Sequence, residues 1–366
     1  MPSVFQIEIC ILNVTLYYNC THICFIFVDV FKSGVWSTFN TIRDPELVRL
    51  AKHLPATVLQ SRQEGTVRVY NSAFQRWKRW ADQYEEVTHL PADPRYISLY
   101  LLSLYQTART HNPITSALYA ISWAHKMAGL SDPTTSRLPQ MVREASLRTL
   151  GQGHNSKEPL TVEMLKLLID KHLINPDNLL NARLNAMCCL AFVAFMRFDE
   201  LSKLKRSDIV FHETYMAVFV EKAKNDVYRI GHWVLVARTG TVYCPVGLLD
   251  RYLKLSGMQD LSDKFIFRAV SYSVKRKVHT LKSANSHLSY TRTREVMLQA
   301  FREIGLDSAK FGTHSLRKGG ITQAALNSVP DRLLKKHGRW VSDRSKDKYI
   351  SEDIKQKLSV TLNLGL

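Results

Sequence analysis

Cysteine is scarce in this sequence, and its positions show no pairing pattern. The 366 residues contain six cysteines, three within the first 24 positions and three at Cys188, Cys189 and Cys244. These spacings exclude a disulfide framework and a cysteine-based zinc site. Cys188 and Cys189 lie in an apolar stretch, which favours buried structural thiols. This cysteine usage fits a reducing intracellular environment.

Acidic residues are few relative to basic ones. Asp and Glu total 32 against 50 Lys and Arg, a net charge of +18. Residues 1–42 hold only Lys32 against Glu8 and Asp29, so they carry −1 and the remaining residues carry +19. Such an excess predicts a polyanionic partner. A hydrophobic content of 45% excludes disorder as the main state, and the length suggests two or three domains.

No long uninterrupted hydrophobic run is present. The most apolar segment is the leader, residues 1–42, in which Glu8, Asn13 and His22 break the run. It has no basic start and no small-residue cleavage site, which disfavours a signal peptide. A membrane helix is also disfavoured, and we expect no membrane partner. The leader is interpreted either as a translated extension that is not native or as a disordered apolar tail.

Helical periodicity dominates residues 43–150. One amphipathic helix is predicted between 66 and 84, a second after Pro94, and a third that stops at Gly129. This segment is expected to form a small all-helical domain. Residues 151–159 have no apolar period and end in a proline, which is typical of a linker.

Residues 160–366 are predicted to form helices that are interrupted once by a strand-like pattern. Helices are predicted over 165–172 and 184–195, and the second of these leads to Arg197. Residues 215–220 and 228–236 are rich in β-branched and aromatic residues and flank a polar turn, which predicts a β-hairpin. Helical segments return beyond Cys244. The predicted fold class is therefore mainly α with a small β-hairpin or sheet.

Several basic residues point to an anionic ligand. Arg197 follows a buried-looking helix, where its guanidinium cannot be neutralised, so it is expected to face a site. His314 and Arg317 are three residues apart and would share one helix face. Residues 310–349 hold ten Lys or Arg against three Asp, a net of +7. A solvated basic face is the alternative interpretation of this run.

In their order and spacing, these residues resemble the active-site set of the tyrosine recombinase (phage-integrase) family. The set comprises Arg197 with Glu200, a hairpin lysine, His314, Arg317, Trp340, and Tyr349 nine residues later. The strings Thr313-His-Ser-Leu-Arg-Lys-Gly-Gly-Ile-Thr and His337-Gly-Arg-Trp-Val-Ser are similar to the eukaryotic branch of Crypton- and DIRS-type mobile elements. The resemblance covers about residues 60–350 and implies a DNA core-binding domain at 43–150 and a catalytic domain at 160–366.

The resemblance implies an enzyme that cuts and rejoins double-stranded DNA at specific sites without a metal or other cofactor. Tyr349 would be the nucleophile and would form a 3′-phosphotyrosine. Arg197 and Arg317 would hold the non-bridging phosphate oxygens. His314 would act as a base or a proton-sharing donor. Lys224 would be the general acid on the hairpin, with Lys222 as the competing choice.

The resemblance also assigns supporting residues. Trp340 stands where many members have a second histidine, and its indole N–H can orient but cannot shuttle a proton. Glu200 would orient the catalytic arginine and histidine, although a helix-surface glutamate is the alternative. Lys346 and Lys348 favour a phosphate-rich setting for Tyr349 over a packing role. DNA contacts are expected at Arg68, Arg76, Lys78, Arg79, Lys318 and Arg339, with Trp77 and Trp80 interleaved among them.

Two other function classes share these features. A domesticated relative that binds DNA without cutting it would keep the same pattern. A type IB topoisomerase would use the same chemistry, but the Arg339-Trp340 pair and the preceding helical domain favour a recombinase. If the source is eukaryotic, the protein would work in the nucleus.

The last sixteen residues, 351–366, predict a short amphipathic helix. Ile354, Leu358 and Leu362 recur at every fourth position, and such a helix must bury this stripe. It packs either on its own domain or on a neighbouring protomer. We expect exchange between protomers, and hence a homo-oligomer on DNA formed through the tail.

Overall fold

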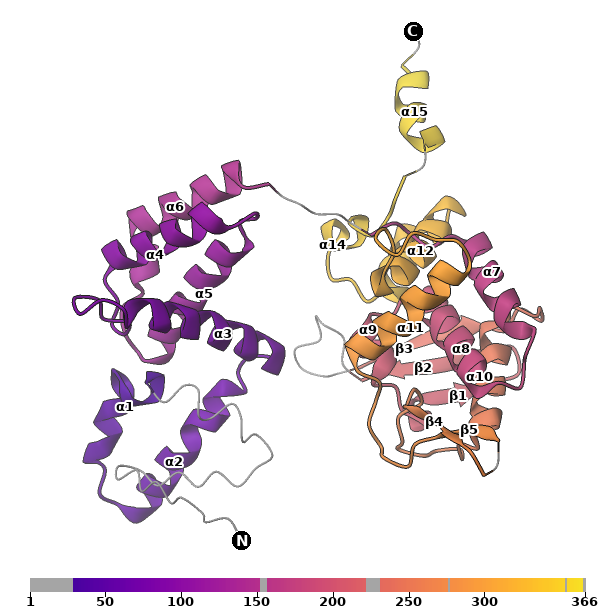
Figure 1. Cartoon of the computed structure of the whole chain (residues 1–366), viewed down its shortest axis with the longest axis horizontal. Coiled ribbons are helices and arrows are strands. Elements are labelled where there is room, and N and C mark those ends of the chain that lie inside the picture. The colour runs from indigo at the N-terminus through magenta and orange to yellow at the C-terminus, as the bar shows by residue number, and fades with distance from the viewer. Residues whose placement is uncertain (1–28, 152–156, 222–230, 276, 353, 365–366) are drawn as a thin grey trace. The chain divides into compact units, whose positions relative to one another are not determined.

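The computed structural model describes residues 29–151, 157–221, 231–275, 277–352 and 354–364. The chain divides into two compact units, Met1–His154 and Asn155–Leu366 (Figure 1). This division falls within the segment predicted as a linker. The described residues are mostly helical and include two small antiparallel sheets, which confirms the predicted fold class. None of the described helices is long and apolar enough to span a membrane.

The first unit is helical throughout its described part. Its elements are η1 (Val30–Lys32), α1 (Val35–Thr38), η2 (Phe39–Thr41), α2 (Pro45–Leu59), α3 (Glu64–Ala81), α4 (Pro94–Thr107), α5 (Asn112–Met127), η3 (Pro133–Thr135) and α6 (Arg137–Thr149). The three predicted helices correspond to α3, α4 and α5. Pro94 begins α4, where the carboxylate of Asp93 accepts a hydrogen bond from the backbone N–H of Arg95.

The core of this unit lies between α3, α4 and α5. Trp77 and Ile97 are fully buried there, and Phe74 is 1% exposed. The unit also begins earlier than the predicted boundary at residue 43. Val30 belongs to this core, and the indole N–H of Trp36 donates to the carbonyl of Met127 at 2.7 Å. Residues 30 and 36 of the predicted leader are therefore packed parts of the helical unit, while residues 1–28 lie outside the described residues.

The second unit joins helices to both sheets. Its elements are α7 (Val162–Leu173), α8 (Leu179–Val193), α9 (Phe198–Ser202), η4 (Arg206–Asp208), β1 (Ile209–Phe211), β2 (Tyr215–Val220), β3 (His232–Ala237), α10 (Pro245–Ser256), β4 (Val270–Ser273), β5 (Val278–Leu281), α11 (Tyr290–Glu303), α12 (Thr313–Leu326), α13 (Asp331–His337), α14 (Asp343–Asp347) and α15 (Ile354–Leu362). Residues 157–159 already belong to this unit, because the N–H of Glu158 donates to the carbonyl of Lys310.

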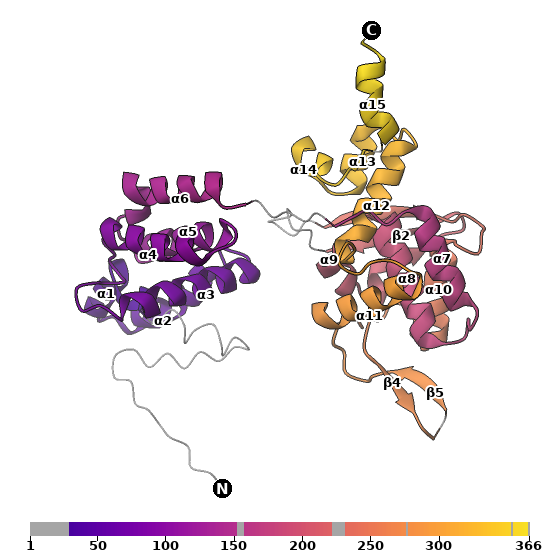
Figure 2. The same ribbon diagram turned by 45° about the horizontal axis from the view of Figure 1, so that its top comes forward.

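The predicted hairpin is present as the antiparallel pair of β2 and β3. Their register runs from Tyr215 opposite Ala237 to Val220 opposite His232, and β1 pairs with the other edge of β2. The connection between β2 and β3 falls within residues 222–230, outside the described residues. The β4–β5 hairpin was not predicted. Figure 2 shows it projecting from the side of the second unit opposite α13 and α14.

Helix α8 is the centre of the second core. Most of its residues are buried, among them the polar Arg183 and Asn185, which fits a helix that has no solvent-facing polar side. Helix α12 approaches it closely through two adjacent glycines. A Cβ at Gly319 would lie 1.9 Å from the carbonyl oxygen of Leu160, and one at Gly320 would lie 2.0 Å from that of Phe192. These glycines let α12 bring Arg317 against the end of α8.

Candidate active site

Arg197, Arg317 and Arg339 converge on one carboxylate in the second unit. Arg197 is the N-cap of α9, Arg317 lies on α12, and Arg339 follows α13. The carboxylate is that of Glu200, on the first turn of α9. Residues from three segments spread over more than 140 positions therefore form one cluster of like charges around a single acid.

Glu200 is 5% exposed and contacts all three arginines. Its carboxylate accepts from the backbone N–H of Arg197 at 2.9 Å and from its guanidinium at 2.7 Å. It accepts from Arg339 at 2.8 Å and lies 3.6 Å from Arg317 Nη1. Burial alone would raise the pKa of this carboxyl, but Arg339, Arg317 and Arg197 more than offset that effect and lower it. Glu200 is therefore ionised, and it is not the helix-surface glutamate of the alternative interpretation.

Arg317 is fully buried at the centre of this cluster. Its guanidinium donates to the backbone carbonyls of Phe195 and Gly338. Phe195 has a φ of 47°, in the left-handed region, and its carbonyl also accepts from Arg339. Burial, with Arg197 as the next contributor, lowers the pKa of Arg317. Arginine is not deprotonated in proteins even when its pKa is lowered, so Arg317 keeps its positive charge in the site.

Tyr349 and Trp340 cover the face of Arg317. The guanidinium carbon lies 4.3 Å from the Trp340 ring centroid and 5.1 Å from that of Tyr349. The two rings are 5.4 Å apart, and they pack with Phe195 and Ile321 in a small apolar cluster. Tyr349 is partly exposed, whereas Trp340 is 5% exposed. Four of the predicted catalytic residues, Arg197, Arg317, Trp340 and Tyr349, are thus brought together.

Arg339 differs from its prediction as a DNA contact. It is 8% exposed, and its guanidinium donates to Glu200 and to the carbonyls of Ala194, Phe195 and His337. These contacts engage both Nη groups of Arg339 inside the protein, so we assign Arg339 to support of the cluster instead of DNA contact. The basic run around Arg339 predicts a DNA contact, and nothing in the run signals that this arginine is buried.

Lys346 also differs from the expectation. We expected it to favour a phosphate-rich setting, but it is 1% exposed and its ammonium pairs with Asp331 and Asp347 at 2.7 and 3.2 Å. Lys348 is exposed. Only Lys348 of this pair therefore remains available for a phosphate.

The remaining predicted residues of the second unit lie at its surface or outside the described residues. His314, in the first turn of α12, is exposed. Lys318 is half-buried and donates to the carbonyl of Lys157 at 3.1 Å, so it holds the start of this unit. Lys224 and its competitor Lys222 lie outside the described residues.

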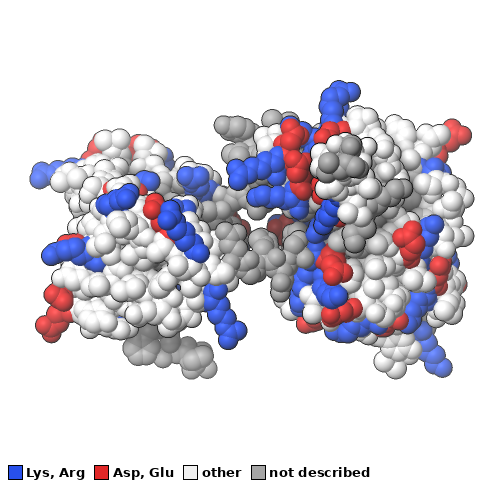
Figure 3. Space-filling view, turned by 90° about the horizontal axis from the view of Figure 1, so that it is seen from above, with Lys and Arg blue, Asp and Glu red and all other residues white. Residues whose placement is uncertain are grey.

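The predicted DNA contacts of the first unit lie on α3. Arg68, Arg76 and Arg79 are exposed, whereas Lys78 pairs with Asp29. Trp77 is fully buried, so the interleaved aromatic residues belong at least partly to the core. Figure 3 shows basic side chains spread over both units on the viewed face, with acidic side chains among them.

The cluster has an excess of positive charge and of donors. Three guanidiniums against Glu200 leave a net charge of +2 in a mostly buried space. The Nε atoms of Arg317 and Arg339 and the Nε1 atom of Trp340 are buried without a hydrogen-bond partner among the described residues. Buried donors and charges are costly unless they are satisfied. An anion beside the cluster, such as a phosphate diester, would offset the excess positive charge.

Comparison with known proteins agrees with this geometry. Residues 160–356, more than half of the chain, match the Phage integrase family. The chain belongs to this family. It is therefore a member of the class of tyrosine recombinases, the enzymes of site-specific recombination.

Similarity to individual proteins extends over both units. The chain is 26% identical over 310 residues to an integrase/recombinase XerD homologue of Selenomonas ruminantium, covering 83% of this chain and 86% of that relative. The fold resembles XerH recombinase in a post-cleavage complex with its difH substrate (TM-score 0.55, 14% identity, 90% and 86% of the two chains). It also resembles a lambda integrase tetramer bound to a Holliday junction (TM-score 0.51, 17% identity, 84% and 81%).

No group of three or more His, Cys, Asp or Glu side chains is placed to hold a metal ion within the part of the chain that the structure describes.

Proposed function

We propose that this protein cuts and rejoins double-stranded DNA through a covalent phosphotyrosine at Tyr349, with arginines taking the role that a metal plays in other nucleases. The observation that carries the proposal is the buried cluster with an excess charge of +2 beside the Tyr349 ring. Arg197 and Arg317 would hold the non-bridging oxygens and stabilise the charge of the pentacoordinate state. Arg339 and Arg197 both bind Glu200, so the carboxylate offsets one of the three charges and the remaining +2 would face the phosphate.

The proposed reaction has a balanced sequence of bonds and protons. The Tyr349 oxygen forms a bond to phosphorus while the bond from phosphorus to the 5′ oxygen breaks. His314 receives the phenolic proton, and Lys224 or Lys222 gives a proton to the departing 5′ oxygen. Attack by a 5′ hydroxyl on the phosphotyrosine reverses these steps and rejoins the strand. Trp340 orients the phosphate through its indole N–H.

Replacement of the nucleophile tests this proposal. Tyr349→Phe removes only the phenolic oxygen, so it should abolish covalent attachment and leave the Kd for DNA nearly unchanged. Denaturing gels with a phosphorothiolate suicide substrate measure the adduct. Adducts at the wild-type level in Tyr349→Phe would exclude the assignment. If the wild-type protein binds DNA but forms no adduct, the alternative of a DNA-binding relative without catalysis is favoured.

We also propose a biological context. The two strings around Arg317 and Trp340 support a place in the Crypton- and DIRS-type branch of mobile-element recombinases, and a nuclear location would follow. We also propose that the protein acts on DNA as a homo-oligomer. The resemblance of its fold to lambda integrase, which forms a tetramer on a Holliday junction, supports this proposal. These assignments rest on resemblance and on fold similarity.

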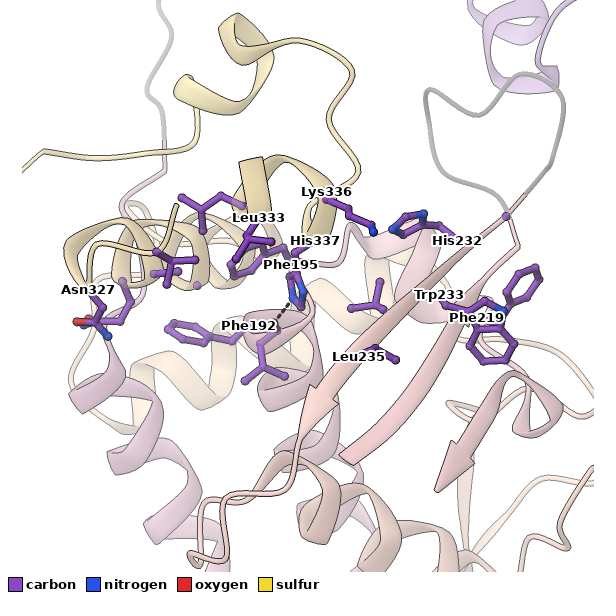
Figure 4. A pocket seen from close by; sticks show the side chains of 18 residues that line it. Phe192, Phe195, Phe219, His232, Trp233, Leu235, Asn327, Leu333, Lys336 and His337 are labelled. Carbon is purple, nitrogen blue, oxygen red and sulfur yellow. Dashed lines mark hydrogen bonds between the residues drawn. The ribbon is translucent and has the colours of Figure 1, made fainter. Parts of the chain in front are cut away.

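The tail supplies a specific hypothesis for assembly. Helix α15 is present, and its Leu358 and Leu362 are 52% and 76% exposed. A groove of about 1040 Å³ lies between β3, α12 and α13 of the same unit. Figure 4 shows its side chains, with Phe192, Phe195 and Leu333 between Asn327 at one end and Phe219 with Trp233 at the other. We propose that this groove receives the α15 leucines of a neighbouring copy.

A further inference from the structure

Lys346 lies three residues before Tyr349 and links two helices. It lies on α14, and its ammonium contacts Asp331, the first residue of α13, at 2.7 Å. The carboxylate of Asp347 lies 3.2 Å from the same ammonium. The Lys346 side chain is 2% exposed, whereas the side chains of the two carboxylates are 75% and 61% exposed. The ion pair therefore ties the buried Lys346 side chain of α14 to the first residue of α13.

The same segment continues directly into Tyr349. The backbone N–H of Tyr349 donates to the carbonyl of Lys346 at 2.9 Å. On its far side, the hydroxyl of Thr322 donates to the Tyr349 carbonyl at 3.3 Å and accepts from the N–H of Ser351 at 3.1 Å. The chain around Tyr349 is therefore fixed at two points, Asp331 on one side and Thr322 on the other.

This arrangement bears on the placement of the phenol. α14 is only five residues long, and a helix of this length is not stable without tertiary contacts. The contacts that secure it thus determine where the Tyr349 ring lies beside Arg317. An error of about 1 Å in the position of a reacting group can reduce a rate about 100-fold.

We propose that Lys346 is a positioning residue, which through Asp331 holds the segment carrying Tyr349 on α13. The proposal rests on the proposed role of Tyr349 as the nucleophile. The positioning role requires a cation at position 346 and a carboxylate at position 331. Neither group would touch the reacting phosphate.

The chain offers a matched control between the same two helices. Lys335 on α13 pairs with Asp343 on α14 at 3.4 Å, with the two side chains 34% and 64% exposed. Exposed pairs contribute little to stability. Asp343→Asn therefore removes one carboxylate from the same helix junction without affecting the covered lysine.

The experiment measures single-turnover adduct formation on the DNA that the wild-type protein cleaves. Asp331→Asn and Lys346→Met should each lower the maximal rate about 10- to 100-fold, with an unchanged half-saturating DNA concentration. The double variant should be no slower than the slower single variant, because both changes break one contact. Asp331→Glu should restore most of the rate, and Asp343→Asn should match the wild type. Wild-type rates in Asp331→Asn and Lys346→Met, or an equal loss in Asp343→Asn, would overturn the proposal.

Hydrogen exchange of the free protein provides the second readout. Asp331→Asn should accelerate exchange of the amides at 343–351 and leave the rest of the chain unchanged. Unchanged exchange at 343–351, or accelerated exchange throughout the second unit with weaker DNA binding, would contradict a positioning role. This measurement needs no cleavage, so it separates the two proposals. If the wild-type protein forms no adduct, the proposed function fails, while exchange still decides whether Asp331 holds the segment.

Discussion

Arg339 donates to the carboxylate of Glu200 at 2.8 Å, and the two side chains are 4% and 2% exposed. The same carboxylate also contacts Arg197 and lies 3.6 Å from Arg317. One buried acid thus holds three guanidiniums in place. Removal of only one partner of a buried ion pair strongly destabilises a protein, because the other charge stays buried without a counter-charge.

Glu200→Gln should reduce the free energy of unfolding by about 3 to 5 kcal/mol at neutral pH. The pKa of Glu200 is lower in the folded chain than in the unfolded chain, where it is about 4.3. Its stabilising contribution is therefore present above about pH 4 and is lost as the pH falls through the lowered folded-state value.

Urea unfolding at several pH values measures this difference. The gap between the wild type and Glu200→Gln should shrink as the pH falls below 4. Glu295→Gln is the control, because Glu295 forms an exposed pair with Arg292 at the same spacing along a helix. A gap that does not depend on pH would show that the charge of Glu200 is not what stabilises the site.

Arg317→Ala should slow cleavage by about 100-fold or more, because the loss of one donor to a developing oxyanion has an effect of this size. Single-turnover rates measure the change. Arg251→Ala is the control, because Arg251 is a partly exposed arginine of α10 that pairs with Asp177. An unchanged rate in Arg317→Ala would remove this residue from phosphate binding.

DNA affinity should fall steeply as salt is added. The +19 carried by residues 43–366 must neutralise many phosphates, and binding releases their counterions. A plot of log K against log salt concentration should have a strongly negative slope. A slope near zero would show that the excess positive charge does not contact DNA phosphates.

Chelators should leave cleavage unchanged, because the proposed mechanism places arginines where a metal would otherwise stabilise charge. Adduct formation in the presence of EDTA measures this. Inhibition that added magnesium reverses would contradict the mechanism.

Truncation tests the tail hypothesis. Deletion of residues 352–366 should spare DNA binding by one protomer and remove cooperative assembly, as measured by sedimentation on DNA. Leu333→Glu, which places a charge in the groove, should have the same effect on assembly. Intact cooperativity in the truncated protein would favour packing of α15 on its own unit.

The sequence by itself determined the helices and the order of the chemical groups. Helical periods are local, so α3, α4, α5 and α7 could be predicted, and the hairpin followed from a change to β-branched residues. Arg197, Arg317, Trp340 and Tyr349 were predicted through their order along the chain, and the fold does place them together.

Only the tertiary structure decided which charged side chains are buried. Arg339 and Lys346 stand in a basic run that looks uniformly solvated. Their burial depends on the packing of α12 against α8 and of α13 against α12. Each has a carboxylate partner on another element, Arg339 on α9 and Lys346 on α13. Such partners are distant in the sequence or lie on short helices without a period of their own. For the same reason, the groove beneath α13 and the exact start of the helical unit could not be predicted from local patterns.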